Sequence, residues 1–199
     1  MTRVAIVDHG GGNVASVRFA LERLGVAASL TADPGEIAGA SHVILPGVGA
    51  ASVAMERLAA TGLDRLLPTL TQPLLGICLG MQLLFDASEE GSTACLGLIK
   101  GVGRRFTAAP GRPVPHMGWN RLESLSPSPL LKGIEPGSYV YFVHSYALAV
   151  GPDTVATTNY GGAFAAVVSR GNVHGVQWHP ERSAAPGARL FENFLALDG

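Results

Sequence analysis

Charged side chains are scarce in this sequence, since they make up 15% of its 199 residues and leave a formal net charge of −1. No basic stripe is available to neutralise phosphates, which argues against nucleic acid as a partner. Only two cysteines occur, Cys78 and Cys95, so a disulfide framework is not indicated. No apolar run approaches the length of a membrane span, and the N-terminus lacks the features of a secretory signal. We therefore expect a soluble, cytoplasmic protein without nucleic-acid or membrane partners.

Apolar residues, in contrast, are abundant, and at 47% of the chain they can fill a large buried core. At this length, one domain spanning residues 1–199 is the simplest organisation. In the first half, short apolar runs alternate with segments of helical periodicity, which is typical of a parallel sheet covered by helices on both faces. The predicted strands are 3–7, 26–30, 42–45 and 74–77, and the predicted helices are 13–24, 52–60, 63–70 and 79–85.

The second half is richer in strands and turns. Strands are predicted at 102–106, 139–143, 154–158, 164–169 and 173–178, and a single helix at 189–197. We expect an antiparallel layer added to the edge of the parallel sheet, with the last strand re-entering the core. Pro110, Pro113 and Pro115 predict an irregular loop between these strands.

Cys78 lies between a predicted strand and a predicted helix, in the run Gly76-Ile77-Cys78-Leu79-Gly80. This is the cysteine form of a nucleophile elbow, in which flanking glycines allow the backbone to approach closely. The positive end of a helix that begins at Leu79 favours the thiolate, and its free N–H groups can bind an oxyanion. The alternative is a small buried cysteine beside packing glycines.

The run His179-Pro180-Glu181 follows the last predicted strand. Pro180 disfavours helix at His179, so we expect the pair to continue extended from that strand. Residues i and i+2 of an extended segment point the same way, which lets Glu181 approach one imidazole nitrogen while the other faces a thiol. Alone, this tripeptide fits a surface turn. Together with the cysteine elbow it predicts a triad of Cys78, His179 and Glu181 for acyl transfer through a thioester.

Two glycine-rich loops follow predicted strands. The loop Pro46-Gly47-Val48-Gly49 lies where parallel sheets bind ligands, and its N–H groups could supply a second oxyanion donor, although a plain turn fits equally well. The run Gly10-Gly11-Gly12-Asn13 lacks the full dinucleotide spacing, and no acidic residue ends the second strand. We therefore reject dinucleotide binding.

The remaining chemistry-bearing residues give weaker signals. His9, His42, His116 and His174 have no metal-ligand spacing, so structural roles are expected and neither a metal nor a cofactor is predicted. Met117 and Trp119 lie in the proline-bounded loop 115–120. They could belong to the core or form an exposed patch for a partner.

Together these segments resemble the class I glutamine amidotransferases, whose signature combines a cysteine elbow with a downstream His-x-Glu. The resemblance runs from residue 10 to residue 182. Within the class the chain is similar to the glutaminase subunits of imidazole glycerol phosphate synthases, because of the run Pro-His-Met-Gly-Trp-Asn at 115–120 and the glycine–Asn pair at 12–13. The other supporting segments are 46–49, 76–85, 141–146 and 177–182. One position departs from the family, since His9 stands where a tyrosine is common.

The resemblance implies a flavodoxin-like, three-layer α/β fold and hydrolysis of L-glutamine to glutamate and ammonia. Cys78 would attack the side-chain amide, His179 would protonate the ammonia and then activate water, and Glu181 would orient His179. Oxyanion donors would come from Leu79 and from the loop at Gly47 and Val48. The positions implied for glutamine binding are Gly49, Gln82, Glu90, Ser145 and Tyr146.

The resemblance also implies a protein partner, the cyclase subunit, a (β/α)₈ barrel. In a heterodimer it would use the ammonia to form imidazole glycerol phosphate and AICAR in histidine biosynthesis. The candidate interface residues are Asn13, Met117, Trp119 and Arg182. A movable peptide at 47–49 would explain a glutaminase that is nearly silent until the partner binds its substrate. Three alternatives stay open: the glutaminase of another synthase, such as that of pyridoxal phosphate or nucleotide synthesis, a non-catalytic regulator on the same fold, and a stand-alone cysteine hydrolase.

Overall fold

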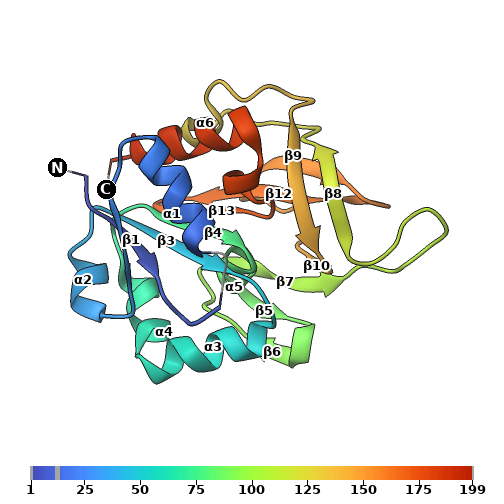
Figure 1. Cartoon of the computed structure of the whole chain (residues 1–199). Coiled ribbons are helices and arrows are strands. Elements are labelled where there is room, and N and C mark those ends of the chain that lie inside the picture. Colours follow the sequence, from blue (N-terminus) through green and yellow to red (C-terminus); the bar gives the residue numbers. More distant parts are fainter. Residues whose placement is uncertain (1, 12–13, 199) are drawn as a thin grey trace.

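The structure, a computed structural model, describes residues 2–11 and 14–198 and arranges them around a seven-stranded sheet (Figure 1). Five neighbouring strands are parallel, and two antiparallel strands extend one edge. The order across the sheet is β11 (Thr154–Asn159), β12 (Ala163–Arg170), β13 (Val173–Val176), β4 (Leu74–Cys78), β3 (His42–Gly47), β1 (Val4–Val7) and β2 (Ala28–Thr31). The mostly parallel sheet, its antiparallel edge and the return of the last strand into the core are therefore confirmed.

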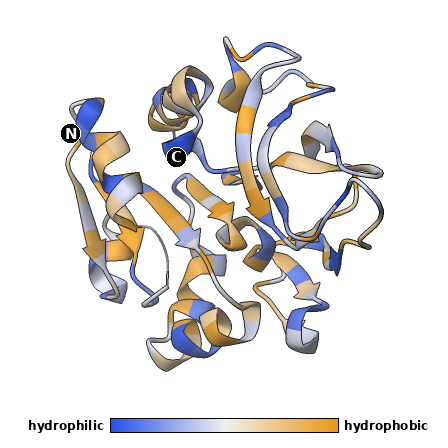
Figure 2. Cartoon of the chain, turned by 45° about the vertical axis from the view of Figure 1, so that its right-hand side comes forward, coloured by the Kyte–Doolittle hydropathy of each residue, from blue (hydrophilic) through white to orange (hydrophobic). Residues whose placement is uncertain are grey.

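Helices cover both faces of this sheet because its inner strands β1, β3, β4 and β13 are buried on both sides (Figures 1 and 2). Along β1, Val4 and Ile6 pack into the cluster that includes α1 (Val14–Arg23) and α6 (Ala184–Leu195). Ala5 and Val7, on the opposite face, pack with α2 (Pro34–Ala38), α3 (Ala51–Ala60) and α4 (Leu63–Leu66). Within the described residues, no helix has the length and apolar character needed to cross a membrane.

Two smaller sheets are built against the carboxyl end of the parallel strands. One has the order β10 (Tyr146–Ala147), β7 (Ile99–Arg105), β5 (Phe85–Ser88) and β6 (Thr93–Ala94), and the other pairs β8 (His116–Arg121) with β9 (Tyr139–His144). The prediction of a loop at 115–120 is thus wrong. Its residues alternate between buried His116 and exposed Met117 and Trp119, which is the period of a strand with one face in the core.

Three predicted helices end or begin elsewhere. Helix α5 (Leu79–Leu83) stops before Phe85, because Phe85 starts β5. The segment 63–70 is α4 followed by a 3₁₀ turn, η1 (Leu67–Thr69), that contains Pro68. Helix α6 begins five residues before the predicted position 189, since Pro186 falls in its first turn, where no backbone N–H is required. The other 3₁₀ turns are η2 (Glu90–Ser92), η3 (Pro129–Leu131) and η4 (Pro180–Arg182).

Candidate active site

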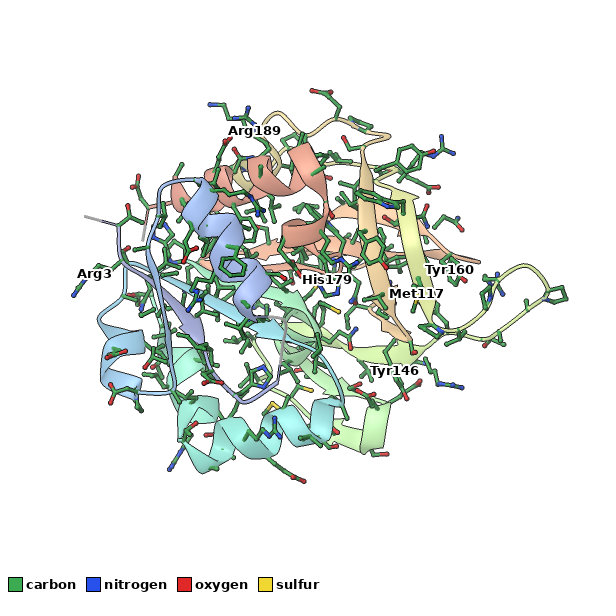
Figure 3. All side chains as sticks on the ribbon, in the orientation of Figure 1. Arg3, Met117, Tyr146, Tyr160, His179 and Arg189 are labelled. Atoms are coloured by element: carbon green, nitrogen blue, oxygen red, sulfur yellow. The ribbon has the colours of Figure 1, made fainter. Side chains whose placement is uncertain are left out.

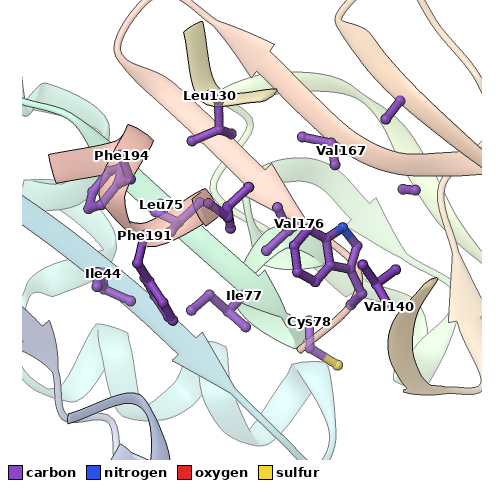
Figure 4. Packing of buried hydrophobic residues seen from close by; sticks show 14 of the residues in the cluster. Ile44, Leu75, Ile77, Cys78, Leu130, Val140, Val167, Val176, Phe191 and Phe194 are labelled. Atoms are coloured by element: carbon purple, nitrogen blue, oxygen red, sulfur yellow. The ribbon is translucent and has the colours of Figure 1, made fainter. Parts of the chain in front are cut away.

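Cys78 occupies a strained turn between β4 and α5. Its backbone has φ 54° and ψ −111°, a conformation that residues with a side chain seldom adopt and that is typical of a nucleophile elbow. Figure 4 shows Cys78 at the end of the strand that carries Leu75 and Ile77, with its sulfur directed away from the packed side chains. The expected elbow is therefore present in the backbone itself.

The turn is tight because α5 packs directly on backbone. A Cβ on Gly80 would lie 1.8 Å from the carbonyl oxygen of Leu45, and one on Gly76 would lie 2.7 Å from the backbone of Gly80. Neither position has room for a side chain. The two glycines that flank Cys78 thus hold β3, β4 and α5 together around it.

His179 and Glu181 form the second half of the site. Nδ1 of His179 lies 2.8 Å from Oε1 of Glu181, and their side chains are only 6% and 1% exposed. The pairing agrees with the prediction, but the predicted extended geometry of the segment is wrong. His179 is extended, whereas Glu181 belongs to the 3₁₀ turn η4 that Pro180 begins, so the turn brings the carboxylate back to the ring.

The second element that fixes His179 is β9. The His179 N–H donates to the carbonyl of Tyr141 (2.9 Å), and the Tyr141 N–H donates to Oγ of Ser183 (3.0 Å). Ser183 in turn donates to the carbonyl of His179 (2.7 Å). In Figure 3, His179 lies between the central sheet and the β8–β9 pair, on the side where Tyr146 is found.

The electrostatic surroundings of His179 suit a base that shares a proton with a thiol. Burial alone would lower the pKa of His179, but the influence of nearby Cys78 and the hydrogen bond and charge of Glu181 outweigh it and raise the pKa to about 10. The imidazole is therefore protonated at neutral pH and can act as a proton donor in the site. Cys95 differs, because burial raises the pKa of its thiol to about 11 and no base is paired with it in the described part of the chain.

A cavity of about 280 Å³ opens above Cys78, just below the usual range for small-molecule sites of about 300–1,000 Å³. It brings together most of the predicted site residues. Those that line it are Val48, Gly49, Cys78, Leu79, Gln82, Glu90, Ser145, Tyr146 and His179. Gly47 lies just behind, paired with Cys78 across β3 and β4, and Glu181 lies behind His179.

Two of the predicted glutamine-binding residues also hold the walls of the cavity. Oε2 of Glu90 accepts from the N–H of Ala51 at the start of α3 (2.8 Å). Nε2 of Gln82 donates to the carbonyl of Tyr146 (2.9 Å) and to Oε1 of Gln177 (3.0 Å). Their side chains therefore keep α3, α5 and β10 in fixed positions around the cavity.

The loop predicted at 46–49 begins later in the structure, because Pro46 and Gly47 belong to β3 and Gly47 pairs with Cys78 of β4. His9, which is buried, donates from Nε2 to the carbonyl of Pro46 (2.7 Å), just before the loop. Val48 is 44% exposed, and Gly49 has φ +94°, a conformation that favours glycine. The structural role expected for His9 is consistent with this contact.

Four further residues line or support the cavity and were not predicted. Pro115, Val143 and His144 line it, and the Cys78 thiol donates to the carbonyl of Val143 (3.7 Å). Gln177, fully buried, approaches the Cys78 sulfur through Nε2 (3.9 Å). A polar residue inside the apolar run 173–178 was the available signal for Gln177, because a buried amide needs partners.

Two of the four predicted interface residues lie on one exposed face of the β8–β9 pair, and a third, Arg182 of η4, lies against that face. Met117 is 63% exposed and Trp119 54% exposed. Tyr141 joins them to exposed Arg182, since its ring lies 5.9 Å from that of Trp119 and 4.5 Å from the Arg182 guanidinium carbon. Asn13 and Gly12 lie outside the described residues.

Known proteins are similar to this chain in both sequence and fold. The profile of the family described as "Glutamine amidotransferase class-I" covers residues 5–197. The chain belongs to this family. Solved structures agree on the fold: a glutamine amidotransferase superposes with a TM-score of 0.75 at 19% identity, covering 96% of both chains. A second, from Thermotoga maritima, gives 0.66 at 19% identity and covers 97% of this chain and 82% of its own.

Curated relatives are similar over the whole chain. The protein named imidazole glycerol phosphate synthase subunit HisH from Xanthomonas axonopodis pv. citri is 55% identical over 197 residues, which are 99% of this chain and 98% of the relative. The protein of the same name from Xylella fastidiosa is 54% identical over 198 residues, 100% and 99% of the two chains. The resemblance seen in the sequence motifs is confirmed.

Proposed function

We propose that this class-I glutamine amidotransferase is the glutaminase subunit of an imidazole glycerol phosphate synthase. The observation that carries the proposal is the buried Cys78–His179–Glu181 arrangement at a small cavity, in a chain 55% identical over nearly its full length to a protein of that name. It hydrolyses L-glutamine to glutamate and ammonia, and the ammonia serves the formation of imidazole glycerol phosphate and AICAR in histidine biosynthesis. The family match over residues 5–197 supports a single domain.

Each member of the proposed triad has a defined step. The Cys78 sulfur attacks the side-chain carbonyl carbon of glutamine, and His179 gives its proton to the departing ammonia. The thioester is then hydrolysed by water that His179 deprotonates, which regenerates the thiol and releases glutamate. Glu181 holds Nδ1 of His179, so that Nε2 carries out the proton transfer.

Stabilisation of the tetrahedral intermediates falls to backbone N–H groups. We assign this to Leu79, which begins α5 beside the sulfur, and to the peptide of Gly47 and Val48. Gly49, Gln82, Glu90, Ser145 and Tyr146 line the same cavity, which supports their assignment to glutamine binding. Because Val48 and Gly49 are exposed and Gly49 has the positive φ that favours glycine, we infer that the peptide at 47–49 moves to complete the oxyanion site when the partner binds its substrate.

The exposed face of Met117, Trp119 and Arg182 is the proposed docking site for the cyclase subunit, a (β/α)₈ barrel, in a heterodimer. Exposed aromatic and arginine side chains are the residue types that anchor protein interfaces. The face adjoins the triad through β9, which shortens the path that ammonia must travel. Asn13 completes the proposed interface.

Ammonia release from glutamine, coupled to glutamate dehydrogenase and measured with the cyclase subunit and its substrate, tests the proposal. Cys78→Ala should abolish release, whereas the matched variant Cys95→Ala should retain it, because Cys95 lies outside the cavity. Undiminished release by Cys78→Ala would contradict the mechanism. Retention of a different synthase on co-purification would favour pyridoxal phosphate or nucleotide synthesis instead. Failure of a glutamine-analogue electrophile to label Cys78 in the complex would favour a non-catalytic regulator.

The docking face is tested separately. Trp119→Ala should weaken binding of the cyclase subunit about tenfold or more, measured by titration calorimetry. Val150→Ala is the control, since Val150 is also half exposed (50%) but lies outside the β8–β9 pair. Equal binding by wild type and Trp119→Ala would place the interface elsewhere.

A further inference from the structure

Two buried histidines face each other across β8 and β9. His116 and His144 are register partners, 3% and 6% exposed, and Nδ1 of His116 lies 3.0 Å from Nε2 of His144. The rings of Phe142 and Tyr160 stack on His116, with centroids 4.8 Å and 4.0 Å away. Burying a polar ring in such surroundings costs free energy unless its nitrogens are hydrogen-bonded. The partner of each nitrogen therefore shows whether that nitrogen carries a proton.

The partners fix which nitrogen of each ring carries the proton. Nδ2 of Asn120 donates to the carbonyl of Asn159 (2.9 Å) and to Nε2 of His116 (3.2 Å). His116 must then carry its proton on Nδ1 and donate to Nε2 of His144, which leaves Nδ1 of His144 to donate to the carbonyl of Tyr146 (2.8 Å). Both rings are neutral in this arrangement. Burial lowers the pKa of His116 to about 4 and that of His144 to about 3, which keeps them so.

The chain of hydrogen bonds continues to the nucleophile. The Tyr146 carbonyl also accepts from Nε2 of Gln82 (2.9 Å), and Gln82 donates to Gln177 (3.0 Å). Nε2 of Gln177 approaches the Cys78 sulfur at 3.9 Å. Buried polar groups thus connect β8 to Cys78 without a break, through the Tyr146 carbonyl and through residues that are at most 6% exposed: His116, His144, Gln82, Gln177 and Cys78.

We propose that His116 and His144 are positioning residues of the glutamine pocket. Their fixed proton positions hold the carbonyl of Tyr146 and, through it, the wall at Ser145 and Tyr146 and the side chain of Gln82. The proposal rests on the function proposed above, because it assigns these walls to glutamine. It replaces the purely structural role expected for His116.

A packing role and a positioning role predict different results. Phenylalanine has nearly the shape of histidine and suits an aromatic cluster, so if His144 only packs, the kinetics of His144→Phe should equal those of wild type. If His144 positions the pocket, the kinetics should change, because the Tyr146 carbonyl loses one of its two donors. The expected result is a KM for glutamine about tenfold higher and a kcat within about threefold of wild type, since the triad keeps its own contacts.

The experiment measures kcat and KM for glutamine in the complex with the cyclase subunit for wild type, His144→Phe, His144→Asn and Phe164→Leu. Phe164 packs against the His144 ring (5.3 Å) but is outside the chain of hydrogen bonds, so Phe164→Leu lowers thermal stability and leaves KM unchanged. Asparagine can place an amide N–H where Nδ1–H stands, so His144→Asn should recover most of the affinity. A KM for His144→Phe equal to that of wild type, or an equal rise in Phe164→Leu, would overturn the proposal.

Two further measurements keep the test decisive. If His144→Phe does not fold, His144→Gln takes its place, because its longer side chain cannot donate from the Nδ1 position. Equal KM values for His144→Asn and His144→Gln would then refute positioning. Nitrogen chemical shifts of the imidazoles in the wild-type protein report the protonated nitrogen directly, and Nε2–H on either ring would also refute it. If the wild-type complex released no ammonia although both rings carried their proton on Nδ1, the result would instead count against the proposed function alone.

Discussion

Replacing the Glu181 carboxylate by an amide isolates the charge that the triad places behind His179. Glu181→Gln keeps the size of the side chain and can keep an oxygen near Nδ1, 2.8 Å from Oε1 in the wild type. It removes the negative charge that stabilises the protonated imidazole. The pKa of His179 should fall in the variant, because Glu181 is one of the two residues that raise it.

The size of the effect follows from the distance and the burial. Two unit charges 2.8 Å apart attract by about 6 kcal/mol at an effective dielectric of about 20, an upper limit that desolvation reduces. Hydrogen bonds to charged groups contribute about 1.5–3 kcal/mol and neutral ones about 0.5–1.5 kcal/mol, so the loss is about 1–2 kcal/mol. Since 1.4 kcal/mol corresponds to a factor of ten, kcat/KM should fall about 5- to 30-fold.

Glutamate dehydrogenase-coupled ammonia release in the complex with the cyclase subunit measures this fall. Glu192→Gln is the matched control, because Glu192 forms an ion pair with Arg189 at the surface, where its side chain is 45% exposed. Activity of the control should stay within twofold of wild type. If Glu181→Gln retained more than half of the wild-type kcat/KM, the assignment of Glu181 as the partner of His179 would be refuted.

Two predictions concern stability, both measured by urea unfolding. Gly80→Ala should lower the free energy of unfolding by about 3 kcal/mol or prevent folding, because its Cβ would overlap the Leu45 carbonyl, whereas Gly151→Ala, with open space around it, should be neutral. A stable Gly80→Ala protein would disprove the close packing of α5. Burial lowers the pKa of His174 to about 4, so between pH 6.5 and 4 the unfolded chain binds a proton that the folded chain does not. Stability therefore falls on acidification, by about 2 kcal/mol from this residue between pH 7 and pH 5, and His174→Gln should remove that share; an unchanged pH dependence would contradict it.

The sequence predicts best those parts of the molecule that depend on local pattern. Strands β1, β3 and β4 are buried on both faces and appear in the sequence as continuous apolar runs. The glycines on either side of Cys78 predict the elbow. The carboxyl ends of parallel strands meet at one edge of the sheet, so the order of strands and loops along the chain is enough to expect Cys78, the loop at 47–49 and His179 together.

The parts that depend on distant contacts could not be predicted. Strand β8 forms only because β9 lies beside it, and three nearby prolines mask its alternation. The pairing of Glu181 with His179 was predicted, but the turn η4 that produces it was not, because the neighbouring β9 supports that turn. Gln177 gains a role only when β13 and β4 are aligned side by side, an arrangement that no local pattern contains.

The position of β9 links catalysis to solubility. Its first edge pairs with β8, and its second edge would be open to another chain if nothing covered it. His179 and Ser183 form hydrogen bonds with the carbonyl and the N–H of Tyr141, and the Cys78 thiol donates to the carbonyl of Val143. His179, Ser183 and Cys78 therefore make the hydrogen bonds to the β9 backbone that a neighbouring strand would otherwise make. Substitutions that loosen the turn at 179–183 should cause aggregation as well as inactivity, so screens for soluble variants of this protein also select for an intact active site.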